Sequence, residues 1–143
     1  MAFSPIQNLA QRVLAFEAAH NNSSGVRADV VVQVIGKLRQ RLVRLAGVDG
    51  FRSLLSRALT LARAEAPSLN LVQVRADGFL EGFDVIEQNH EAGMAGQAGI
   101  VLVAQLLELL ITFIGEPLTL RLVHDVWPDA PTTMTDLRSE EKL

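Results

Sequence analysis

The chain has 143 residues, of which 49% are hydrophobic and 20% are charged, and its formal net charge is −3. This size and composition predict one globular domain with its own core and exclude an intrinsically disordered chain. Cysteine is absent, which excludes disulfides, cysteine-ligated zinc and a cysteine nucleophile. The first residues lack the basic and apolar regions of a secretory signal, so we expect a cytoplasmic location.

The N-terminal half reads as three helices. Ser4-Pro5 begins the first, because serine is a favoured N-cap and proline suits the first helical position. Apolar residues at helical spacing continue this helix to a polar turn after residue 20. A second helix is predicted over 26–46, where the following glycine ends it, and a third over 49–66, just before a proline.

The segment 69–83 allows two interpretations. Asp77-Gly78 lies between apolar residues, which is a hairpin signal, and the flanking residues alternate as strands do. The alternative is an extended loop that leads into a helix from about Leu80 to Glu91. Two short strands alone are marginally stable and would have to pack on the helices.

The C-terminal half predicts two more helices and a tail. A very apolar helix is expected over 99–115 and another from Pro117 to Trp127, and the polar residues 131–143 read as a tail. The predicted fold is therefore an all-α, compact, single-domain bundle of five or six helices over residues 1–130. A short hairpin or extended loop near 69–83 is the open point.

The apolar helix gathers its polar residues on one side. At 100° per residue, an arc of about 80° contains all four of them, which are Gln97, Gln105, Glu108 and Thr112. The apolar run is short for a membrane span, and a glutamate near its middle would be costly there. The rest of the helix, like the last helix, is apolar over a wide arc. This predicts either a central helix or apolar surface left over for a partner.

Two E-x-x-H pairs are the candidate metal-binding motifs. This spacing puts a carboxylate and an imidazole on one helix face and resembles the pattern of di-iron four-helix bundles. Both pairs lie at predicted helix ends, however, and the helix order differs from that family. We therefore expect solvated side chains and no metal or cofactor. The metal alternative would use Glu17, His20, Glu87 and His90, with Glu108 as a buried ligand.

Charge is distributed unevenly along the chain. Residues 37–63 carry seven basic side chains and one acid, namely Lys37, Arg39, Arg41, Arg44, Arg52, Arg57 and Arg63 against Asp49. Residues 77–91 carry five acids and no base, namely Asp77, Glu81, Asp84, Glu87 and Glu91. If this second segment is helical, its acids form one continuous face. Either set could be a solvated face, or the two could pair with each other.

These features predict a non-enzymatic interaction module, an adaptor or scaffold that self-associates through apolar helix faces and opposed charged patches and also binds another protein. Head-to-tail association is one arrangement that the opposed patches allow. The size and charge layout are similar to those of death-fold adaptor modules. The expected interface residues are Lys37, Arg41, Arg44, Arg52, Arg57, Asp77, Glu81, Asp84, Glu87 and Trp127. The alternatives are an enzyme with a metal or small-molecule site inside the bundle, and a membrane-active helical protein. The acidic net charge and sparse aromatic residues argue against nucleic acid as a partner.

Overall fold

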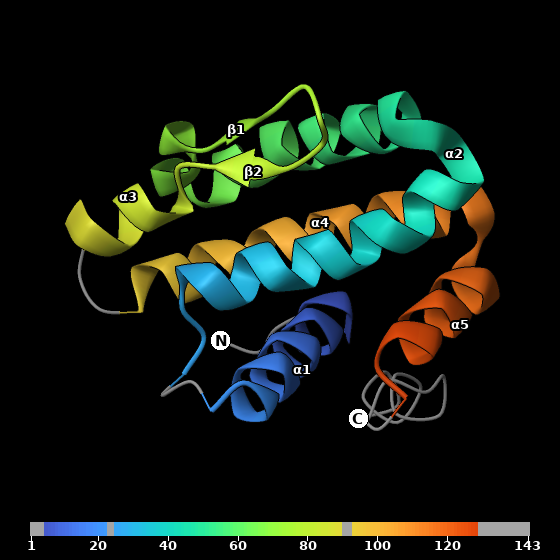
Figure 1. Ribbon diagram of the computed structural model, residues 1–143, viewed down its shortest axis with the longest axis horizontal. Helices are drawn as coiled ribbons and strands as arrows, with labels where there is room; N and C mark the ends of the chain where they lie inside the picture. The colour runs from blue at the N-terminus through green and yellow to red at the C-terminus, as the bar shows by residue number, and fades with distance from the viewer. Residues whose placement is uncertain (1–4, 23–24, 90–92, 129–143) are drawn as a thin grey trace.

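The computed structural model describes residues 5–22, 25–89 and 93–128, and these form an all-α bundle with one small hairpin (Figure 1). This confirms the predicted fold class. The elements in chain order are α1 (Pro5–His20), α2 (Ala28–Glu65), the 3₁₀ helix η1 (Pro67–Leu71), β1 (Gln73–Val74), β2 (Leu80–Glu81), α3 (Phe83–Asn89), α4 (Met94–Ile114) and α5 (Glu116–Val126). The predicted N-cap Ser4 and the predicted tail 131–143 lie outside the described residues.

The apolar helix α4 is the central helix of the bundle. It packs against α1, α2, α3 and α5, which is why its apolar surface is so wide. Two glycines allow α2 to come close: a Cβ at Gly99 would lie 2.3 Å from Cγ2 of Val31, and one at Gly96 would lie 2.6 Å from the carbonyl oxygen of Val26. By length and composition alone, α4 is also the one described helix that could cross a membrane.

Helix α2 bends sharply at Gly47. There the backbone has φ 78° and ψ 170°, a combination that only glycine adopts without strain. The predicted helix end at Gly47 is thus a bend, after which a second helical arm continues directly. Figure 1 shows this bend near the α4–α5 junction at one end of the long axis, with α3 at the opposite end.

The segment between α2 and α3 contains the hairpin. The strands β1 and β2 are antiparallel, with Gln73 opposite Glu81 and Val74 opposite Leu80. Gly78 has φ +86°, and the backbone N–H of Phe79 donates to Oδ1 of Asp77 at 3.1 Å. This turn prevents a helix from starting before residue 83. Asp77 and Glu81 lie in the hairpin, so the described acids of 77–91 do not share one helix face, and Glu91 lies outside the described residues.

Candidate functional site

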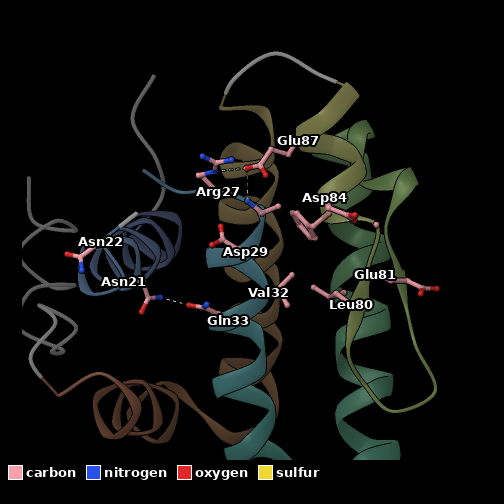
Figure 2. Close-up of a pocket in the computed structure, with 13 residues that line it drawn as sticks. Asn21, Asn22, Arg27, Asp29, Val32, Gln33, Leu80, Glu81, Asp84 and Glu87 are labelled. Atoms are coloured by element: carbon pink, nitrogen blue, oxygen red, sulfur yellow. Dashed lines mark hydrogen bonds and ion pairs between the residues drawn. The ribbon is translucent and has the colours of Figure 1, made fainter. Parts of the chain in front are cut away.

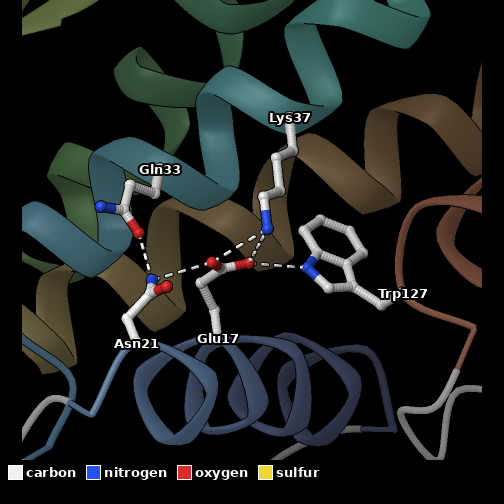
Figure 3. Close-up of polar contacts among 5 residues, drawn as sticks. All are labelled: Glu17, Asn21, Gln33, Lys37 and Trp127. Atoms are coloured by element: carbon white, nitrogen blue, oxygen red, sulfur yellow. Dashed lines mark hydrogen bonds and ion pairs between the residues drawn. The ribbon is translucent and has the colours of Figure 1, made fainter.

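A buried carboxylate lies between α1, α2 and the end of α5. Glu17 is only 2% exposed. Nζ of Lys37 donates to its two oxygens at 2.7 and 3.0 Å, Nε1 of Trp127 donates at 3.0 Å, and Nδ2 of Asn21 donates at 2.9 Å. Asn21 also bonds to Oε1 of Gln33. Figure 3 shows these five residues, which we call the Glu17 cluster, converging from the three helices.

The Glu17 cluster holds a charge inside the bundle. Burial by itself raises the pKa of Glu17. The hydrogen bonds from Lys37, Trp127 and Asn21 lower the pKa, as does the charge of Lys37, and together they hold it below its usual value. With four donated bonds, the carboxylate is a structural tie between helices. The expectation of a solvated Glu17 was wrong. Its position on the apolar face of α1, three residues after Leu14 and four after Val13, was the available signal.

Among the described residues, the other metal candidates are not assembled with Glu17. His20 is exposed and stacks on the ring of Phe16 at 6.1 Å between centroids. The carboxylate of Glu87 accepts bonds from Nε of Arg27 at 3.3 Å and from the first N–H of α2 at 3.1 Å. Glu108 is exposed on the polar side of α4. His90 lies outside the described residues, and the part of the chain that is described holds no group of three metal-ligating side chains that could bind an ion.

The structure divides the predicted basic residues into two groups. Three are used inside the chain. Lys37 belongs to the Glu17 cluster, Arg39 bonds to the carbonyl of Asp77 and lies 4.3 Å from the centroid of the Phe79 ring, and Arg63 donates to two backbone carbonyls after α2. The second group is exposed and forms no ion pair within the described ranges, and its members are Arg41, Arg44, Arg52 and Arg57.

Three of these free arginines border two adjoining hollows at the bent end of the molecule. The hollows have volumes of about 430 and 450 Å³ and share Leu45 and Ile114 in their walls. Arg41, Arg44 and Arg121 border the first, where Asp125 is the one acidic lining residue, and Arg57 borders the second. We call this surface the arginine end.

Large apolar side chains are exposed at the arginine end. Leu45 is 71% exposed, Phe113 64% and Leu118 55%, and Val48 beside the bend is 37% exposed. Most residues of the wide apolar arcs on α4 and α5 are covered by neighbouring helices. The apolar surface that both helices leave uncovered therefore concentrates here, and exposed apolar clusters rimmed by polar groups are typical of interaction sites.

An acidic hollow of about 890 Å³ lies at the other end, between the start of α2 and the hairpin and α3. In Figure 2, Val32 and Leu80 point toward each other across it. Its charged lining consists of four carboxylates and one arginine, which are Asp29, Glu81, Asp84, Glu87 and Arg27.

Glu87 pairs with Arg27 at 3.3 Å. The other three carboxylates are exposed and contact no cation among the described residues. Asp29 was not predicted as part of this acidic patch, because only the fold brings α2 beside α3.

Three predicted interface residues have other positions. Lys37 and Trp127 both belong to the Glu17 cluster, and Trp127 is only 2% exposed, so neither is part of a free surface patch. Asp77 pairs with Arg75 at 3.0 Å in the hairpin turn. A fourth predicted residue, Glu87, lines the acidic hollow but is paired with Arg27. The predicted interface residues that remain unpaired in the described chain are the four exposed arginines, Glu81 and Asp84.

Comparison with known proteins gives no relative. No family model matches the chain, and neither the curated proteins nor the solved structures give a match.

Proposed function

We propose that the protein is a non-enzymatic helical interaction module, an adaptor or scaffold that binds protein through the arginine end. The observation that supports this is the exposure of Leu45, Phe113 and Leu118 within one rim of unpaired arginines. In a protein interface, such apolar side chains supply affinity while the rim charges set orientation and encounter rate.

The adjoining hollows also fit a protein partner better than a small substrate. Their walls are apolar and open, and among their lining residues the polar groups are mainly arginine side chains at the edge. A catalytic pocket needs convergent acid, base or nucleophilic groups. The buried carboxylate of Glu17 does not line these hollows, and its oxygens accept hydrogen bonds from Lys37 and Trp127.

The test is a double variant, Leu45→Ser with Phe113→Ser. Both side chains are largely exposed, so the fold should persist. Leu71→Ser is the matched control, because Leu71 is 43% exposed but lies outside the arginine end. Association would be followed by sedimentation velocity across concentrations and by comparing the proteins that copurify from the native cell.

We expect the wild type and Leu71→Ser to self-associate or to recover a specific copurifying protein. The double variant should lose that self-association or fail to recover that protein. If all three proteins sediment alike and recover the same partners, the arginine end is not the binding surface and the proposed function is wrong.

A further inference from the structure

We infer that the arginine end is occupied by the acidic hollow of a second copy of this chain, so that copies join head to tail. This inference rests on the proposed function and names the occupant of the same surface.

The two surfaces carry complementary charges. Four arginines and one aspartate line the hollows of the arginine end, and four carboxylates and one arginine line the acidic hollow. The arginines have no ionic partner in the described chain, and the same is true of Asp29, Glu81 and Asp84. Docking one end on the other would pair these charges and fix the relative orientation of the two copies.

Both surfaces also contain apolar side chains. Val32 and Leu80 point toward each other in the acidic hollow, and the side chains of Asp29 and Glu81 lie on its outer sides, with Glu81 pointing away from Val32 (Figure 2). At the arginine end, Leu45 and Phe113 project into solvent with arginines beside them. Docking would therefore bring apolar side chains with basic neighbours against a mixed surface of apolar and acidic side chains.

The two surfaces lie at opposite ends of the molecule. The bend of α2 and the α4–α5 junction lie at one end of the long axis, and α3 lies at the other (Figure 1). The two surfaces cannot meet within one chain. A symmetric contact between two arginine ends would place arginine against arginine. A head-to-tail contact avoids this and repeats from copy to copy, which gives a ring or an open chain.

The experiment uses two charge-reversed full-length variants. The end variant carries Arg44→Glu and Arg121→Glu, and the hollow variant carries Glu81→Lys and Asp84→Lys. All four side chains are exposed. The controls are Arg52→Glu, an exposed arginine that lines neither hollow, and Glu65→Lys, an exposed acid outside the acidic hollow.

We expect the wild type and both controls to form dimers and larger species at low salt, and each double variant to associate at least about tenfold more weakly. Mixing the end variant with a fluorescently labelled hollow variant should restore a one-to-one or larger complex, because each still offers one intact surface. Wild-type association should weaken between about 0.05 and 0.5 M salt, as the Debye length falls well below 10 Å.

Three outcomes would overturn the inference. A hollow variant that associates like the wild type would show that the arginine end binds something else, and the proposed function would survive. Failure of the mixture to associate would show that the two surfaces do not face each other. A monomeric wild type that binds phosphatidylserine vesicles through Arg44 and Arg121 would assign the surface to a membrane instead.

Discussion

Lys37 and Arg41 lie one turn apart on the first arm of α2, and the protein uses them in opposite ways. Nζ of Lys37 reaches a carboxylate that is 2% exposed, and its charge is neutralised inside the chain. Arg41 is exposed at the edge of an apolar hollow and has no ionic partner among the described residues. One group holds helices together, whereas the other is available to a partner.

The difference between them comes from what the neighbouring helix presents. Helix α1 places one acid, Glu17, on its buried face beside Lys37, and the end of α5 adds the indole N–H of Trp127. Near Arg41 the chain presents Leu45, Leu118 and Arg121. Substitutions in the Glu17 cluster should therefore change stability, and substitutions at the arginine end should change association.

The largest stability loss is expected for Trp127→Ala. Trp127 is 2% exposed, so truncation should cost about 3–5 kcal/mol, as for other buried aromatic side chains. Urea unfolding measures this loss, and the wild-type fluorescence of this single tryptophan should be blue-shifted. Leu118→Ala, at a 55% exposed site, is the control and should change stability by less than about 1 kcal/mol. Equal effects would contradict the burial of Trp127.

Glu17→Gln should follow, with a loss of about 2–3 kcal/mol at neutral pH, because hydrogen bonds to a charged group are stronger than those to an amide. The side chain of Lys37 is 42% exposed and can turn toward water, so the cost stays below that of a fully buried pair. A double-mutant cycle with Lys37→Met measures the coupling between the two residues. A coupling energy near zero would show that the ion pair does not contribute.

The Glu17 cluster also predicts a pH dependence. The pKa of Glu17 is lowered in the folded state from an ordinary value of 4.5, so its contribution to stability is complete above that pH and is lost as the pH falls through the lowered pKa. The stability difference between the wild type and Glu17→Gln should therefore shrink below about pH 4.5. Denaturant unfolding of both proteins at several acidic pH values tests this, and a constant difference would contradict it.

Gly47→Ala tests the bend that creates the arginine end. No atom lies within 4 Å of a Cβ placed there, so the expected loss of about 1–2 kcal/mol comes from the backbone conformation alone. Gly36→Ala is the matched control in the same helix, where a Cβ also meets nothing within 4 Å. That change should stabilise the protein by about 0.5–1 kcal/mol. Thermal unfolding of both variants would show opposite shifts in Tm.

Glu108→Gln should have the smallest effect. It makes the same glutamate-to-glutamine change as Glu17→Gln, but on an exposed side of α4. The free energy of unfolding should therefore change by less than about 0.5 kcal/mol. Urea unfolding at pH 7 makes the comparison directly. A loss as large as that of Glu17→Gln would mean that Glu108 has a buried partner that the exposed position does not explain.

Local patterns in the sequence were enough to predict the all-α class, helices that begin at or next to prolines, the break at Gly47 and the polar side of α4. These features depend on local preferences: proline lacks a backbone N–H, glycine adopts positive φ, and apolar residues repeat at the helical period. For residues 69–83 the sequence allowed both a hairpin and an extended loop that leads into a helix. The structure has the hairpin, with the turn at Asp77-Gly78 and with Leu80 and Phe83 buried after it.

How each charge is used depends on tertiary packing. Glu17 and Lys37 are 20 residues apart, and Glu17 and Trp127 are 110 apart, so no local pattern pairs them. Asp29 joined Glu81 and Asp84 because α2 packs beside the hairpin, and Arg121 joined Arg41 and Arg44 because α5 folds back on the bend of α2. Helix periodicity fixes which side of a helix is apolar, whereas the neighbour that covers that side depends on the packing of the whole chain.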